Sequence, residues 1–397
     1  MSEWQEAYLN EAFDIGSGLS KPAEDFGSGF PFLSFKEIFN NFFLPDALSE
    51  LVESNEEERD KCSVKKGDVF LTRTSETVKE LGMSCVALKD YEDATFNGFT
   101  KRLRTNGNFE IVPEYTGYYF RSSKFRNEVT ALSSASTRAS LNNEMLGRLK
   151  IILPSKIEQE EIAAVLICLD RKISNLRQQN ETLEAIAQTL FKHWFVDFEF
   201  PNEDGKPYKS SGGEMERSEL GEIPVGWRSG VLGEIALFNN GKSSPERNEN
   251  SKIPVYGSNG VIGNTTIANN QKTVIIGRVG SYCGSLYYYL HQCWVTDNAM
   301  TGRLKKHKSH AYLYLFLATS RLNKLSGGSG QPLLNQSILS SIELAIPDDY
   351  LIQDFEEITN PLFRKIFFNQ NSIRTLTKTR DRLLPKLMSG QLRITEL

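Results

Sequence analysis

The stretch from Leu169 to Leu190, LDRKISNLRQQNETLEAIAQTL, places a leucine at every seventh position. A second set has the same period and is offset from the leucines by four residues: Ile173, Asn180, Ala187 and Trp194. Alternating steps of four and three are the spacing of a coiled-coil seam. The sequence therefore predicts a long helix that packs along a partner helix.

A matching heptad pattern lies near the C-terminal end. Its seam consists of Leu362, Asn369, Leu376 and Leu383 together with Ile366, Ile373, Arg380 and Leu387. Residues 156–199 contain five basic and eight acidic residues, whereas residues 361–395 contain eight basic residues and one acidic residue. This opposite charge favours pairing of the two helices, with Asn180 and Asn369 setting the register. Two ordinary buried helices are the alternative.

The rest of the chain is also written twice. Trp4, Leu9 and Ser17-Gly18 recur 223 residues later as Trp227, Leu232 and Asn240-Gly241. Arg73 aligns with Arg278 at an offset of 205, and Arg102 aligns with Arg303 at 201. From Asn142 and Asn335 onward the offset stays at 193. An ordered series of this kind indicates two homologous halves, whose globular parts differ in length.

These observations define an expected architecture for the 397 residues. We expect a mixed α/β (α+β) fold with two globular domains in a tandem pseudo-twofold arrangement, separated by two long helices that form an antiparallel coiled coil. The predicted segments are a first globular domain (1–155), a central helix (156–200), a linker (201–223), a second globular domain (224–348) and a C-terminal helix (349–397). The linker is assigned from its Gly, Pro, Ser and charged residues.

The compartment is predicted from what the sequence lacks. No apolar run is long enough to span a bilayer, and the acidic N-terminus does not have the layout of a secretory signal. The five cysteines form no CxxC pair and no spacing typical of zinc sites. We expect a soluble cytoplasmic protein with no membrane partner.

Catalytic motifs are incomplete. Phe26-Gly-Ser-Gly29 has neither the preceding strand nor the following helix that a cofactor loop needs, and Asn360-Pro361 lacks the second proline of an adenine-binding loop. Pro347-Asp348 is followed by no (D/E)xK motif. We therefore predict no catalytic residue and no metal ligand in this chain.

Basic, amide and aromatic side chains in loop-like sequence suggest binding of nucleic acid. Arginine forks match guanine edges and phosphates, and Asn and Gln match adenine. A net charge of −4 does not exclude this role, because the charge is unevenly placed. The candidates are Arg73, Asn97, Lys101, Arg102 and Arg138 in the first domain, and Asn259, Arg278, Tyr282, Asn298, Arg303 and Gln331 in the second. The duplicated arginines are favoured, although a shared structural salt bridge would explain them equally well.

Several motifs together resemble a known family. They are Leu153-Pro154-Ser-Lys-Ile-Glu158-Gln159-Glu-Glu-Ile162-Ala163, Leu190-Phe191-x-x-Trp194-Phe195, Gly221-Glu-Ile-Pro224-x-Gly226-Trp227, Ile253-Pro-Val-Tyr-Gly-Ser-Asn-Gly-Val-Ile-Gly263 with Ile276-Gly-Arg278-Val-Gly280, and Leu384-Pro-Lys-Leu-Met-Ser-Gly390-x-Leu-Arg393. Over essentially its whole length the chain resembles the specificity subunit of Type I restriction-modification systems. One departure is Ile352-Gln353, where the first copy has Glu158-Gln159.

The resemblance implies a function. Each globular domain would be a target-recognition domain that reads one half of a split double-stranded DNA site, and the two helices would act as a spacer. The chain would bind no cofactor itself. It would dock two modification subunits, which hold S-adenosylmethionine and methylate adenine, and restriction subunits, which use ATP and Mg²⁺. A helical scaffold without a DNA role, or a self-contained methyltransferase or nuclease, are the alternatives.

Overall fold

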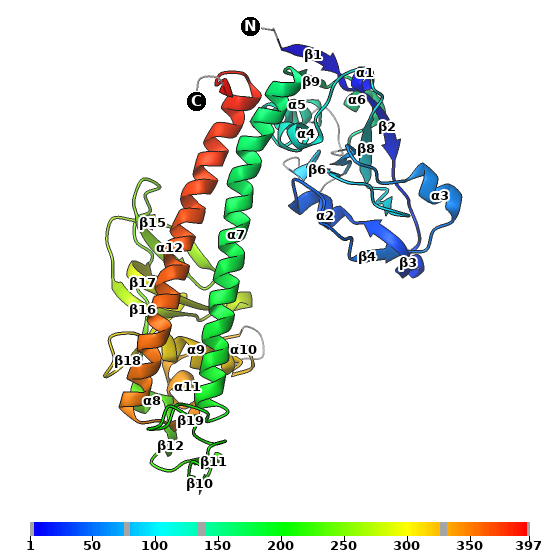
Figure 1. Cartoon of the computed structure of the whole chain (residues 1–397). Helices are drawn as coiled ribbons and strands as arrows, with labels where there is room; N and C mark the ends of the chain where they lie inside the picture. The colour runs from blue at the N-terminus through cyan, green and yellow to red at the C-terminus, as the bar shows by residue number, and fades with distance from the viewer. Residues whose placement is uncertain (1–3, 75–79, 134–139, 326–331, 395–397) are drawn as a thin grey trace. The chain divides into compact units, whose positions relative to one another are not determined.

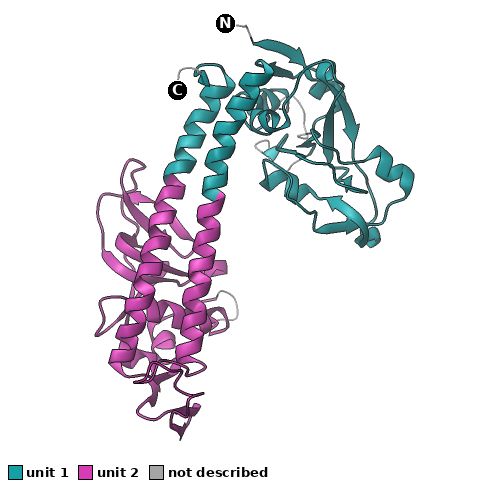
Figure 2. Cartoon of the chain, viewed as in Figure 1, with its two compact units in different colours: residues 1–173, 375–397 teal, residues 174–374 magenta. Residues whose placement is uncertain are grey.

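The structure divides into two compact units. This computed structural model describes residues 4–74, 80–133, 140–325 and 332–394. Unit 1 comprises residues 1–173 and 375–397, and unit 2 comprises residues 174–374 (Figure 2). Each unit is therefore a globular domain together with the segments of two long helices that pack against it.

The two long helices are α7 (Lys156–Phe195) and α12 (Asp349–Met388), each of 40 residues (Figure 1). They begin and end at matched positions, because the offset of 193 residues holds from one end to the other. Within each unit the two helical segments run antiparallel. In unit 1 Asp170 on α7 forms an ion pair with Arg380 on α12, and in unit 2 Asn180 faces Asn369.

The predicted seam is the buried face of these helices. Every seam residue named from the heptad pattern is buried or half-buried. Asn369 is fully buried and its Nδ2 donates to Asn180 Oδ1 at 2.9 Å. The Asp170–Arg380 ion pair, at 2.6 Å, realises the predicted charge complementarity within unit 1. The coiled-coil prediction is confirmed.

Unit 1 contains the first globular domain. Its elements are β1 (Gln5–Tyr8), α1 (Leu9–Ala12), β2 (Phe13–Ser17), η1 (Ala23–Asp25), β3 (Phe26–Leu33), α2 (Phe35–Asn40), β4 (Glu50–Val52), α3 (Glu56–Lys61), β5 (Val69–Thr72), β6 (Ser84–Val86), β7 (Thr95–Phe96), β8 (Thr100–Thr105), α4 (Pro113–Tyr119), α5 (Ser123–Ser133), α6 (Asn143–Gly147) and β9 (Lys150–Leu153). The sheets have strand orders β2-β8-β5-β6, β4-β3-β7 and β1-β9. Aromatic residues of α4 pack with Ile162 and Leu166 of α7 and with Leu387 of α12 in one core.

Unit 2 contains the second globular domain. Its elements are β10 (Met215–Ser218), β11 (Gly221–Pro224), β12 (Arg228–Val231), α8 (Leu232–Ile235), β13 (Ala236–Asn240), β14 (Ile253–Gly257), β15 (Gly260–Thr265), β16 (Asn270–Gly277), η3 (Gly280–Tyr282), β17 (Leu286–Val295), β18 (Ala299–Leu304), α9 (Ala311–Thr319), α10 (Leu322–Leu325), α11 (Gln336–Ser340) and β19 (Glu343–Ile346). The main sheet has the order β13-β18-β16-β17-β14-β15. Its core includes Phe191 and Phe195 of α7 and Phe355 of α12.

The two domains have the same framework. Strands β1 and β9 pair in the same register as β12 and β19, and β2-β8-β5 corresponds to β13-β18-β16. Two glycines lie at matched close approaches between chains. A Cβ on Gly18 would lie 2.3 Å from the carbonyl oxygen of Asn97, and one on Gly241 would lie 2.0 Å from that of Thr296. The predicted duplication and mixed α/β class are confirmed.

The strand register corrects one detail of the sequence alignment. Thr72 pairs with Thr100 in the first domain, and Gly277 pairs with Ala299 in the second. Along these strands the offset is therefore 199, so Arg104 corresponds to Arg303, whereas Arg102 corresponds to Thr301. The alignment of Arg102 with Arg303 is wrong by two residues. Because side chains alternate between faces with a period of two, such a slip leaves the inward and outward pattern unchanged.

The sequence also predicted that no segment crosses a membrane. Within the described ranges, none of the helices is both long enough and apolar enough to do so.

Candidate nucleic-acid interface

Arg73 and Arg278 occupy the same backbone position in the two domains. Each follows the last residue of a buried central strand, β5 or β16. The Arg73 N–H donates to Phe99 O at 2.8 Å, and the Arg73 carbonyl accepts from Leu141 N–H at 2.8 Å. The matching bonds of Arg278, to Asn298 O and from Leu334 N–H, are both 3.0 Å. The sequence match of these two arginines is therefore a structural match.

The loops around these arginines form one surface in each domain, which we call the strand-end surface. In the first domain it consists of residues 17–20, 73–74 and 97–99, and in the second of residues 240–242, 258–259, 278–282 and 296–298. Parallel bridges hold both versions together, between Leu19 and Asn97 in one and between Lys242 and Thr296 in the other. The surface is thus built on paired backbone rather than on unsupported loops.

Two predicted residues of the first domain are exposed or half-exposed on this surface. Arg73 is exposed. Asn97 is half-buried and shapes a tight turn, because its Oδ1 accepts the Phe99 N–H at 2.7 Å. These two residues come together at the strand end as the sequence predicted, and their contact with DNA stays a prediction.

Lys101 lies beneath the strand-end surface with only 6% of its area exposed. Its Nζ donates to Ser17 Oγ at 2.7 Å and to Asn143 Oδ1 at 2.6 Å. Burial lowers the pKa of the Lys101 ammonium, and the nearby charge of Arg73 lowers it further. The structure gives Lys101 internal partners and adds a positive charge close to Arg73.

Arg102 also makes internal contacts. Its Nη1 donates to Ser63 O at 2.8 Å, and its guanidinium lies over the ring of Phe96, 5.4 Å from the ring centre. Burial is the main cause that lowers the pKa of Arg102. These contacts favour a role in holding α3 and its following loop against the sheet, while contact of Arg102 with DNA stays a prediction.

In the second domain three predicted residues are exposed: Asn259, Tyr282 and Asn298. Arg278 is half-buried beside them. Ser258 ties the cluster together, since its hydroxyl donates to Asn298 O and its carbonyl accepts from Ser285 Oγ. The structure therefore brings together predicted residues from three separate loops.

The remaining predicted residues lie elsewhere. Arg303 is half-buried in β18, and its Nη2 donates to Asn270 Oδ1 at 3.0 Å. Arg138 and Gln331 lie outside the described residues.

The sequence analysis did not select Phe99, which is 63% exposed on the strand-end surface. Phe99 directly follows Asn97-Gly98. An Asn-Gly dipeptide indicates a turn, so this pair was the signal that could have placed Phe99 at the surface.

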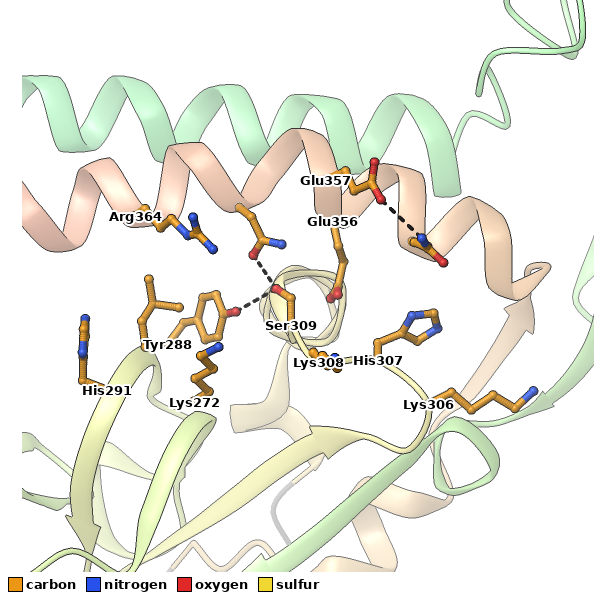
Figure 3. Close-up of a pocket in the computed structure, with 13 residues that line it drawn as sticks. Lys272, Tyr288, His291, Lys306, His307, Lys308, Ser309, Glu356, Glu357 and Arg364 are labelled. Carbon is orange, nitrogen blue, oxygen red and sulfur yellow. Dashed lines mark hydrogen bonds between the residues drawn. The ribbon is translucent and has the colours of Figure 1, made fainter.

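A cleft of about 780 Å³ in unit 2 was considered as a second site (Figure 3). One wall carries Lys272, Lys306 and Lys308, and the opposite wall is α12 with Glu356 and Arg364. Tyr288 hydrogen-bonds Ser309, which donates to Asn360 Oδ1 of α12. These bonds attach the domain to the helix, so the cleft has a structural role.

Glu356 is the buried carboxyl group of this cleft. Only 4% of its area is exposed, and its Oε1 has no hydrogen-bond partner in the structure. Burial raises the pKa of Glu356 to about 7, although backbone N–H groups at the start of α9 act in the opposite direction. Over the described segments, no group of three or more His, Cys, Asp or Glu side chains is placed to hold a metal ion.

Comparison with known proteins gives one family. The model of the Type I restriction modification DNA specificity domain matches residues 1–185 and 224–373. The chain is 28% identical to the Type I restriction enzyme MjaIX specificity subunit of Methanocaldococcus jannaschii, over 100% of this chain and 95% of that protein. It is 24% identical to the HindI specificity subunit of Haemophilus influenzae, over 99% and 100% of the two chains.

A solved structure has a similar fold. The S subunit of a Type I restriction-modification system from M. genitalium superposes with a TM-score of 0.63 at 18% sequence identity, covering 97% of this chain and 96% of that chain. At this identity the match bears on the fold alone.

Proposed function

Because the chain belongs to the Type I restriction-modification DNA specificity family, we propose that it selects the target of a Type I complex by reading an asymmetric DNA site in two parts. Each globular domain would read one part through its strand-end surface. Double-stranded DNA is thus the proposed ligand, and the chain catalyses no reaction itself.

The observation that carries this proposal is the matched position of Arg73 and Arg278. Two copies of one framework present an arginine at the same strand end, where its fork can reach a phosphate or a guanine edge. The neighbouring loops differ, because Phe99 in one domain corresponds to Asn298 in the other. Different side chains at matched positions favour two different half-sites.

We assign partner docking to the outward faces of α7 and α12. Large apolar side chains are exposed there, including Ile157 and Ile186 on α7 and Ile358 and Phe368 on α12. Exposed apolar groups on helices are typical of surfaces that bind other proteins. The proposed partners are two modification subunits, which would hold S-adenosylmethionine, and restriction subunits, which would hold ATP and Mg²⁺.

We also propose that α7 and α12 set the gap between the half-sites. Each is one continuous helix with residues in both units. Half-sites read on one face of DNA are spaced by about 34–36 Å, one helical turn. Inserting one heptad at matched positions of both helices should lengthen the tolerated gap, and an unchanged gap would count against the spacer role.

The decisive experiment is to co-express the chain with its neighbouring modification gene and to map methylated adenines by sequencing. The expected result is a two-part motif with different halves and a gap of fixed length. A single uninterrupted motif would contradict the proposal.

Two measurements separate the alternatives. A helical scaffold predicts no steep salt dependence of DNA binding, whereas neutralisation of phosphates requires one. The Arg73→Ala, Arg278→Ala double variant should reduce the slope of affinity against salt concentration. A self-contained methyltransferase predicts that the purified chain methylates DNA when S-adenosylmethionine is added, and we expect no product.

A further inference from the structure

One position of the strand-end surface differs in chemistry between the two domains. It is the last residue before strand β8 or β18, occupied by Phe99 in the first domain and Asn298 in the second. We propose that Phe99 recognises the 5-methyl group of a thymine and that Asn298 recognises an adenine at the matched place in the other half-site. This inference rests on the proposed function and names the bases that one matched pair of residues reads.

Phe99 is exposed on a turn that holds it firmly. Its N–H donates to Asn97 Oδ1 at 2.7 Å, and its carbonyl accepts from the Arg73 N–H at 2.8 Å. On either side, Gly98 N–H donates to Leu19 O at 2.7 Å and Thr100 N–H donates to Asn97 O at 3.0 Å. An aromatic ring that is 63% exposed on so fixed a backbone is prepared to contact another molecule.

The charge around Phe99 suits DNA. Arg73 is exposed and its backbone is bonded to that of Phe99, and the ammonium of Lys101 lies close enough to Arg73 for their charges to interact. A cation at this place can hold a phosphate, while the neighbouring ring reaches the edge of a base. Among the side chains that read bases in the major groove, an apolar one matches only the thymine methyl.

Asn298 is presented in the same way by different bonds. Its carbonyl accepts from the Arg278 N–H at 3.0 Å and from the Ser258 hydroxyl. Its side chain is exposed, and across the described residues no hydrogen bond occupies its amide group. An Asn amide can donate to N7 and accept from the N6 amino group of adenine at once.

The test uses the complex of the full chain with its modification subunit. The methylated motif of the wild type is mapped first, and duplexes are then made in which each thymine of the half-site read by the first domain is replaced by deoxyuridine. At one position the loss of the methyl group should weaken binding about fourfold, which corresponds to about 0.8 kcal/mol for one buried methyl group. The Phe99→Ala complex should bind both duplexes equally.

Two variants serve as controls. Phe368→Ala removes a ring that is also 63% exposed but lies on α12, and it should keep the fourfold difference. Asn298→Ala should relax the requirement for one adenine in the other half-site and leave the thymine position unchanged.

The inference is overturned if the wild-type complex binds thymine and deoxyuridine duplexes equally at every position, or if Phe99→Ala keeps the difference. A half-site without thymine, or a uniform loss of affinity in Phe99→Ala, would also overturn it. The wild-type measurement does not depend on the variant being folded. Failure of the proposed function is distinct, because the wild type would then show no two-part motif.

Discussion

The two globular domains use the same strand arginine in different ways. In the first domain Arg104 binds both carboxylate oxygens of Asp68, which is fully buried, at 2.7 and 2.6 Å. In the second domain the matched Arg303 bonds the neutral amide of Asn270 at 3.0 Å. The arginine within the strand therefore supports the domain, whereas the arginine at the strand end faces outward. Position in the framework, and not recurrence alone, separates the two roles.

The largest effect is expected from breaking the first of these contacts. Arg104→Ala leaves the buried Asp68 carboxylate without its cation, so the free energy of unfolding of unit 1 should fall by about 3–5 kcal/mol. Arg303→Ala removes one neutral bond and should cost about 1 kcal/mol in unit 2. Hydrogen exchange of the β5 and β16 amides measures the two units separately. Equal losses would show that the two arginines do the same work.

The second contrast concerns pH. Glu356 on α12 corresponds to Ala163 on α7, since the helices are offset by 193 residues, so only unit 2 has a buried carboxyl group at this place. Burial raises the pKa of Glu356 to about 7 from an ordinary value of 4.5. Between these pH values the folded state holds a proton that the unfolded state has lost. The stability of unit 2 should therefore fall as the pH rises through this window, by up to about 3 kcal/mol.

Glu356→Gln tests this assignment. The amide keeps an acceptor for the start of α9 but does not titrate. The variant should show no such slope and should melt at a higher temperature than the wild type at pH 8. The same pH slope in both proteins would assign it to other groups.

The third contrast should disappear if the two frameworks are equivalent. Gly18→Ala and Gly241→Ala each place a Cβ against a backbone carbonyl oxygen, at 2.3 and 2.0 Å. Both should destabilise their own unit by about 1–3 kcal/mol, because neither chain can move without disturbing a sheet. Chemical denaturation monitored by hydrogen exchange gives both values. A cost in only one domain would mean that the matched approach is not under the same constraint.

The smallest effect is expected at the helix seam of unit 2. Asn369 Oδ1 is buried without a partner, although its Nδ2 bonds Asn180. Replacing both asparagines by leucine should change the free energy of unfolding by no more than about 1 kcal/mol, with a gain more consistent than a loss. In unit 1 the matching test, Arg380→Leu, leaves Asp170 without its cation and should be the more harmful change. A large loss in the double leucine variant would show that the amide pair stabilises the seam.

The helices were predictable because each seam position repeats the same demand for burial. Both α7 and α12 begin at predicted residues, and Asn180 and Asn369 meet as the heptads required. The strand alignment was less secure. A shift of two residues keeps every side chain on the same face, so only the backbone pairing of Thr72 with Thr100 could reveal it.

The site was only partly predictable, for a different reason. Arg73 and Arg278 were found because the same residue recurs in the same local pattern. Burial of Lys101 depends on Ser17 and Asn143, which are distant in sequence, so nothing near Lys101 announces it. Phe99 was missed because an aromatic residue in a strand-rich segment is ordinarily buried, and its exposure follows from how three loops meet.

The boundary between the two units inside α7 and α12 has a consequence for synthesis on the ribosome. All of unit 2 lies within residues 174–374, so it can complete its fold while translation continues. The first globular domain, although made earlier, needs Leu384, Leu387 and Met388 to cover Ile162 and Leu166. A nascent chain must therefore keep that apolar groove uncovered until its last segment leaves the exit tunnel, and a product stopped prematurely would carry the groove as an open target for chaperones or proteases.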